Sequence, residues 1–129
     1  MASQIKKVGI TGALGNIGTT LQKGLKDKYA LTLYDIRDTK PQHGKYIIKV
    51  DFAKQKQIEG IFDGLDALVH LAGNPHPDAL ARQTIRNNFI ATSFVFEEAK
   101  RARTGKVVFA SSNFYHQGDI GKALRGDLE

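Results

Sequence analysis

Apolar runs of strand length alternate with amphipathic stretches along this chain. The runs cover residues 5–10, 30–35, 46–50, 67–72 and 106–110. A run that is apolar throughout is typical of a strand buried on both faces of a parallel sheet. Between the runs, apolar spacing predicts helices over about 16–28, 54–62 and 78–103. Strands that alternate with helices predict a doubly wound parallel α/β sheet with the strand order 3-2-1-4-5.

The spacing of apolar residues also predicts which helix faces are buried. Apolar side chains three or four positions apart lie on one side of a helix and are expected to face the sheet. The predicted inward residues are Ile17, Leu21 and Leu25 in the first helix, and Ile85, Phe89, Thr92 and Phe96 in the last.

Three regularly spaced glycines follow the first predicted strand. Gly12, Gly15 and Gly18 lie where the chain passes from an apolar run into the first predicted helix. Gly12 permits a tight turn, Gly15 leaves room for a phosphate beside the backbone, and Gly18 lets the helix approach the sheet closely. Asp35 ends the second strand at a distance that suits a ribose ligand. The pattern predicts a dinucleotide-binding turn; the alternative is a glycine-rich connector in an unrelated α/β domain.

Length, charge and composition restrict the other classes of protein to which the chain could belong. The 129 residues predict a single domain over 1–129, within which the tail 114–129 is not assigned. The net charge of +6 comes from scattered basic residues, so we interpret it as a solvated surface and not as a nucleic-acid site. The chain has no apolar run of membrane-spanning length and no apolar leader, which predicts a cytoplasmic protein without membrane partners.

Cysteine chemistry is absent from the chain, and no metal site is predicted. The sequence contains no cysteine, and His76 and His116 lack the spacing of a ligand pair. His70 lies inside the most apolar run and is expected to be a packed core residue.

Four short motifs follow one another along the chain. They are Thr-Gly-x-x-Gly-x-x-Gly at 11–18, His-Leu-Ala-Gly at 70–73, Asn-x-x-x-Thr at 88–92 and Ala-Ser-Ser-Asn at 110–113. Over roughly residues 5–116, the chain resembles the extended short-chain dehydrogenase/reductases. Within them it is most similar to the NAD-dependent epimerase/dehydratase group and its uronate and sugar dehydrogenases. The resemblance implies a Rossmann-type sheet that is truncated relative to the family.

The resemblance assigns expected roles to individual residues. The residues expected at the pyrophosphate are Gly12, Leu14, Gly15, Ile17 and Gly18. Those expected at the adenosine are Asp35 and Ile36 at the ribose and Asp51 and Phe52 at the adenine. Those expected along the rest of the cofactor are Leu71, Ala72, Gly73, Asn88, Ala110 and Ser111. Ser112 matches the catalytic serine that hydrogen-bonds the substrate.

The acidic residues decide which cofactor is expected. A carboxylate at Asp35 repels a 2′-phosphate, so NAD is expected over NADP, although Arg37 nearby could accept that phosphate. For Asp35 and Asp51, the alternative is a role in turns or helix capping.

One family motif is missing from the chain. In the family, the substrate passes a hydride to the nicotinamide while a tyrosine, assisted by a lysine four residues further along, takes the hydroxyl proton. Each tyrosine here is followed at that offset by another residue: Leu33, Asp38, Val50 or Asp119. We therefore expect the NAD-binding domain of a sugar-type oxidoreductase or epimerase, acting on a uronate, hexose or nucleotide sugar and inactive by itself. The alternative is a non-catalytic dinucleotide-binding sensor or interaction module. Absence of the family's next helix also predicts self-association, or a partner, over an exposed face of the helix at 78–103.

Overall fold

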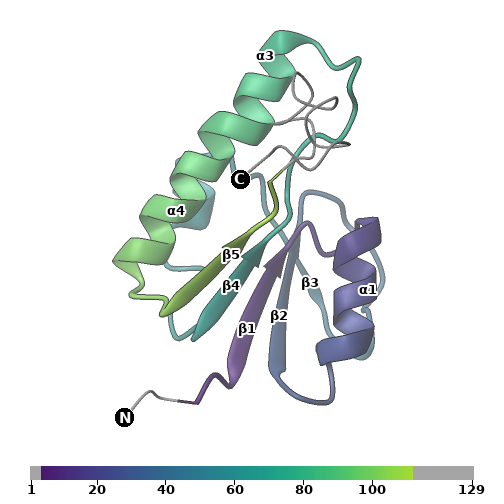
Figure 1. Cartoon of the computed structure of the whole chain (residues 1–129), viewed down its shortest axis with the longest axis vertical. Coiled ribbons are helices and arrows are strands. Elements are labelled where there is room, and N and C mark those ends of the chain that lie inside the picture. The colour runs from purple at the N-terminus through teal and green to yellow at the C-terminus, as the bar shows by residue number, and fades with distance from the viewer. Residues whose placement is uncertain (1–3, 112–129) are drawn as a thin grey trace, which may run out of the picture.

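The computed structural model describes residues 4–111, which form a parallel sheet with helices on both faces (Figure 1). The strands are β1 (Lys7–Thr11), β2 (Ala30–Asp35), β3 (Ile47–Lys49), β4 (Ala67–His70) and β5 (Lys106–Phe109). The helices are α1 (Asn16–Leu25), α2 (Gln55–Ile58), α3 (Ala81–Thr84) and α4 (Ala91–Arg101), with the π-helical segment η1 (Ile85–Ile90) between the last two. The five strands lie in the order β3-β2-β1-β4-β5, which confirms the predicted topology.

Two apolar clusters, one on each face of the sheet, hold the helices. The cluster under α1 contains Val8, Ile10, Leu31 and Leu33, with Leu21 and Leu25 of α1 packed against it. The cluster under α4 contains Tyr34, Phe52, Phe62, Leu68 and Val95. Because successive strand residues point to opposite faces, Leu33 and Tyr34 of the same strand belong to different clusters.

The inward face of α1 differs from the predicted one at its first position. Leu21 and Leu25 do pack on the sheet, but the side chain of Ile17 is 59% exposed. Gly18 and Gln22 are buried in its place. Gln22 is a polar residue that the apolar pattern passes over, and its Nε2 donates a hydrogen bond of 2.7 Å to the carbonyl of Ala13. The face of α1 is therefore set by close approach to the glycine turn as well as by apolar spacing.

The prediction for the last helix is wrong about the buried face. The helix begins at Ala81, and its six central residues, 85–90, form the wider turns of a π-helix. A spacing of four that is extended through this segment follows the wrong side, because a π-helix has more residues per turn than an α-helix. The exposed apolar residues are Ile85, Phe89, Ile90 and Phe96, with Thr92 half-buried. The residues buried against the sheet are Ala91, Val95, Glu98 and Ala99. The exposed face agrees with the expected apolar surface, but the association with a partner stays a prediction.

The second predicted helix is shorter than its apolar spacing indicates. It spans Gln55–Ile58 only, because Gly60 adopts a φ of +79° that a right-handed helix does not permit. The chain then folds back so that Phe62 reaches the core.

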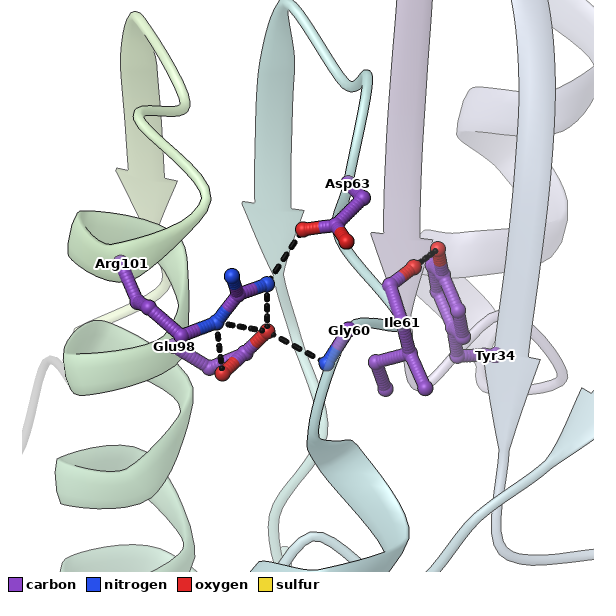
Figure 2. A network of polar contacts seen from close by, with 6 residues as sticks. All are labelled: Tyr34, Gly60, Ile61, Asp63, Glu98 and Arg101. Atoms are coloured by element: carbon purple, nitrogen blue, oxygen red, sulfur yellow. Dashed lines mark hydrogen bonds and ion pairs between the residues drawn. The ribbon is translucent and has the colours of Figure 1, made fainter.

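A polar network fastens this turn to α4 and to β2 (Figure 2). Glu98 is nearly buried and accepts a hydrogen bond of 2.8 Å from the N–H of Gly60. Arg101 pairs with Glu98 and with Asp63. On the other side, the hydroxyl of Tyr34 donates to the carbonyl of Ile61 at 2.6 Å. The segment between α2 and β4 is thus held by hydrogen bonds where it has little regular structure.

Candidate functional site

The glycine turn after β1 lies against the backbone of the loop after β4. Gly12 has a φ of +67°, and a Cβ placed on it would lie 2.8 Å from the amide nitrogen of Ala72. A Cβ on Gly18 would lie 2.7 Å from the carbonyl oxygen of Ala13. Both positions therefore require glycine for the fold itself. A Cβ on Gly15 would meet only the carbonyl oxygen of Gly12, at 3.3 Å, a tight contact but a looser one than those at Gly12 and Gly18.

The first turn of α1 offers main-chain donors beside Gly15. Gly15 is the N-cap residue, no side chain caps the helix, and the first turn contains no acidic residue. The first N–H groups of an α-helix have no partner within the helix and attract anions. The N–H groups just before the helix are already used: that of Leu14 donates to Asp35 Oδ2 at 2.9 Å, and that of Gly15 donates to the carbonyl of Gly12 at 3.0 Å.

Asp35 is buried at the carboxyl end of β2 and is already surrounded by donors. Besides Leu14, its carboxylate accepts hydrogen bonds from the Arg37 N–H at 3.0 Å, Nε at 3.0 Å and Nη2 at 3.3 Å. Burial by itself would raise the pKa of Asp35, but the hydrogen bonds from Arg37 and Leu14 outweigh it and lower the pKa below its usual value. The carboxylate is therefore ionised at neutral pH. Ile36 next to it is 56% exposed.

Asp51 follows β3 and joins the sheet to η1. Its Oδ2 accepts a hydrogen bond of 2.6 Å from Arg86 Nη2, and its Oδ1 accepts one of 3.1 Å from the N–H of Ala53. Burial opposes ionisation, but Arg86 and the backbone donor lower the pKa of Asp51 below its usual value. The ring of Phe52 is buried in the core, so any ligand contact there would involve its backbone.

Asp35 and Asp51 both have the alternative role that the sequence suggested, the stabilisation of a turn. Asp35 and Asp51 each accept a hydrogen bond from the N–H two residues further along the chain. Such a bond stabilises a local turn. Neither carboxylate is committed to the turn alone, because each also pairs with an arginine.

The loop after β4 is held from two sides. The N–H groups of Leu71 and Ala72 both donate to Thr11 Oγ1 at 3.1 Å. Asn88 in η1 accepts from the N–H of Asn74 at 2.5 Å and donates to its carbonyl at 3.1 Å. A Cβ on Gly73 would lie 3.1 Å from Asn88 Oδ1. The neighbouring Asn87 pairs with Arg86 instead.

The carboxyl end of β5 completes this edge of the sheet. The N–H of Ala110 donates to the carbonyl of His70 at 3.2 Å, and Ser111 is exposed. Ser112 lies outside the described residues. His70 is fully buried, which confirms the predicted core position.

Those motif residues that fall within 4–111 thus gather at one edge of the sheet, where the strand order reverses between β1 and β4. The sequence analysis missed Arg86 and Asn74, whose partners are 35 and 14 residues away along the chain. Among residues 4–111, no cluster of three metal-ligating side chains is found. The same range holds no helix of the length and apolarity that crossing a bilayer requires.

Comparison with known proteins gives a consistent result. The model of the NAD dependent epimerase/dehydratase family matches residues 8–123. The L-arabinose 1-dehydrogenase (NAD(P)(+)) of Haloferax volcanii is 32% identical over 111 residues, which are 86% of this chain and 42% of that protein. The uronate dehydrogenase of Pseudomonas putida is 31% identical over 118 residues, 85% of this chain and 43% of that protein.

Solved structures agree in fold. A variant of uronate dehydrogenase from Agrobacterium tumefaciens, crystallised in complex with NAD, superimposes with a TM-score of 0.76 at 27% identity. The match covers 85% of this chain and 42% of that one. The chain therefore spans less than half the length of the relatives it matches.

Proposed function

Since the chain belongs to the NAD-dependent epimerase/dehydratase family, we propose that it binds NAD and serves as the cofactor-binding part of a sugar-type oxidoreductase or epimerase. The observation that supports this most directly is the glycine turn. Gly12 and Gly18 are required by the fold, whereas a Cβ on Gly15 would meet a single backbone oxygen, at 3.3 Å, beside an uncapped helix N-terminus. The fold requires a glycine less strictly at this second position than at the other two, but a pyrophosphate lying on the helix requires one there.

The proposed pyrophosphate site consists of the turn and the first residues of α1. The cradle fits a phosphate, because a side chain at Gly15 would fill the space next to the N-terminal N–H groups of α1. Gly12 and Gly18 shape the turn, and Leu14 and Ile17 flank it. Ile17 is exposed at this end of α1, which supports a role facing a ligand.

The adenosine is proposed to lie over the ends of β2 and β3. There Asp35 would accept hydrogen bonds from the ribose hydroxyls, with Ile36 beside it and Asp51 and the Phe52 backbone near the adenine. The carboxylate of Asp35 disfavours a 2′-phosphate, which supports NAD as the preferred cofactor. Arg37 holds that carboxylate in the structure, so its guanidinium must move aside when a ribose binds.

The other half of the cofactor is proposed to follow the ends of β4 and β5. Its expected neighbours are Leu71, Ala72, Gly73, Asn88, Ala110 and Ser111. A bound NAD supplies the hydride acceptor for oxidation of a sugar carbon. Ser112 is proposed to hydrogen-bond the substrate oxygen. A uronate, a hexose or a nucleotide sugar fits the family, and uronate is also the substrate in the name of the Pseudomonas putida relative.

The missing tyrosine and lysine pair favours a second candidate for this polypeptide alone. Within its 129 residues there is no Tyr-x-x-x-Lys to accept the substrate proton. Loss of a general base costs about 10²- to 10⁴-fold in rate. The chain by itself would then be a dinucleotide-binding module without turnover. Incubation with NAD and glucuronate or glucose, followed at the absorbance of NADH, distinguishes the two, since only the enzyme forms the reduced cofactor.

Isothermal titration calorimetry with NAD and NADP tests dinucleotide binding, which both candidate functions require. The decisive variant is Gly15→Ala, because its methyl group would meet the fold only at the Gly12 carbonyl oxygen, 3.3 Å away, but would occupy the space of the proposed pyrophosphate. Gly24→Ala is the matched control, since Gly24 is in the same helix with nothing within 4 Å of its added Cβ. We expect NAD to bind the wild type and Gly24→Ala, and to bind Gly15→Ala far more weakly. Equal binding to all three proteins would refute the site.

A further inference from the structure

A chain of three side chains, two of them fully buried and Thr92 half-buried, runs from the sheet to α4 just behind the candidate site. Thr11 Oγ1 lies 2.7 Å from His70 Nδ1, and His70 Nε2 lies 3.0 Å from Thr92 Oγ1. The imidazole has no exposed surface; Phe109 stacks on it and Phe52 meets it edge-on. The three residues come from β1, β4 and α4, so the chain links three elements that are remote in sequence.

Hydrogen-bond counting gives the direction of every link. A threonine hydroxyl has one hydrogen to donate and two lone pairs to accept with. The N–H groups of Leu71 and Ala72 both point at Thr11 Oγ1 at 3.1 Å, and that of Leu71 is shared with the Thr11 carbonyl oxygen at 3.2 Å. The acceptor side of Oγ1 therefore faces these two donors. Its hydrogen is therefore donated to His70 Nδ1, which must be the unprotonated nitrogen. The neutral ring then carries its proton on Nε2 and donates it to Thr92.

A neutral ring is also what this environment favours. Burial without an acidic partner disfavours the imidazolium and lowers the pKa of His70 to about 4. A protonated Nδ1 would compete with two backbone donors for the oxygen of Thr11. Burial keeps the ring neutral, and the hydrogen-bond geometry then places its single proton on Nε2.

This chain fixes the loop after β4 with respect to the glycine turn. Thr11 is the last residue of β1 and directly precedes the turn, and it also carries the first two N–H groups of the loop. Thr92 lies one helical turn after Asn88, which holds Asn74 at the far end of the same loop. His70 connects β1 to α4 by one hydrogen bond to each.

We propose that His70 is a positioning residue for dinucleotide binding, whose Nε2–H tautomer sets the distance between the phosphate turn and the loop of Leu71–Gly73. The inference rests on the proposed function. The adenosine half of the ligand is assigned to the β2 side by Asp35, so the nicotinamide half must cross to the β4 side, where this loop lies. A displaced loop would therefore weaken contacts to the nicotinamide half and leave those to the adenosine half intact.

Ring-nitrogen chemical shifts from ¹⁵N NMR of the ¹⁵N-histidine-labelled chain test the tautomer without any ligand. We expect the His70 Nδ1 to have the shift of an unprotonated nitrogen and Nε2 that of a protonated one at pH 7. The opposite assignment would overturn the proposal, because Thr11 could not then carry the loop and the ring in the way described.

Titration with NAD and with ADP tests the positioning role. Thr92→Val removes the acceptor of Nε2–H at nearly constant volume, and Thr92→Ser keeps the hydroxyl. We expect Thr92→Val to weaken NAD by about five- to tenfold, the loss of roughly one hydrogen bond, while ADP affinity is unchanged. Thr92→Ser should bind both ligands as the wild type does. Equal weakening of NAD and ADP, or none, would overturn the positioning role. A wild type that binds neither ligand would refute the proposed function instead, whatever the tautomer.

Discussion

Two glycines of α1 are expected to respond to the same substitution with opposite signs. In Gly18→Ala, the new methyl group would overlap the carbonyl oxygens of Gly12 and Ala13. These are backbone atoms of a turn in which Ala13 is fully buried, so no side chain can move aside. In Gly24→Ala, the methyl group would meet nothing within 4 Å.

The sizes of the two effects follow from packing and helix propensity. Overpacking of a close contact costs about 1–3 kcal/mol. Replacing glycine by alanine inside a helix returns about 1 kcal/mol. Gly18→Ala should therefore lower the free energy of unfolding by up to about 2 kcal/mol, and Gly24→Ala should raise it by about 0.5–1 kcal/mol.

Urea denaturation followed by far-ultraviolet circular dichroism measures both changes against the wild type. A Gly18→Ala protein that is as stable as Gly24→Ala would refute the reasoning, because it would mean that α1 does not approach the turn as closely as described. The slope of the transition must stay the same in all three proteins for the comparison to hold.

Three further substitutions test the interior. Tyr34→Phe removes the hydroxyl that donates to the Ile61 carbonyl at 2.6 Å and should cost about 1 kcal/mol of stability in urea denaturation, whereas Tyr46→Phe, 81% exposed, should cost nothing measurable. Glu98→Gln replaces a buried acceptor of Gly60 and Arg101 and should cost about 1–2 kcal/mol by the same assay. Because burial lowers the pKa of His70 to about 4, the unfolded chain takes up a proton first as the pH falls. Stability should drop by up to about 1.4 kcal/mol per pH unit between pH 6.5 and pH 4, and this part of the slope should vanish in His70→Gln.

The sheet could be predicted from sequence because each strand is a continuous apolar run, and the order of the strands is the one that accompanies a dinucleotide-binding glycine turn after the first strand. The helix faces were less predictable. Ile17 fits the apolar spacing but stays exposed, and Gln22 breaks the spacing but is buried by one hydrogen bond to the turn. The π-helical η1 changes which side of α4 faces the sheet, and the spacing of apolar residues does not reveal a π-helix.

The motif residues were found from local sequence, whereas their partners were not. Asp51 could be singled out because it follows a strand, but its pairing with Arg86 depends on how η1 crosses the edge of the sheet. Thr11 and Thr92 lie in recognisable motifs, yet their meeting on His70 is a property of three packed elements. Such contacts depend on tertiary packing, which a short sequence window does not contain.

The guanidinium of Arg37 competes with the proposed ribose for the carboxylate of Asp35. A ribose can reach the carboxylate only in the fraction of molecules whose guanidinium has moved away, and the apparent affinity for the proposed dinucleotide is reduced by that fraction. Removing the arginine side chain would therefore tighten NAD binding without adding a single contact. The occupancy of the site would then depend on the fraction of molecules in which the Arg37–Asp35 ion pair is broken as well as on the contacts of the ligand.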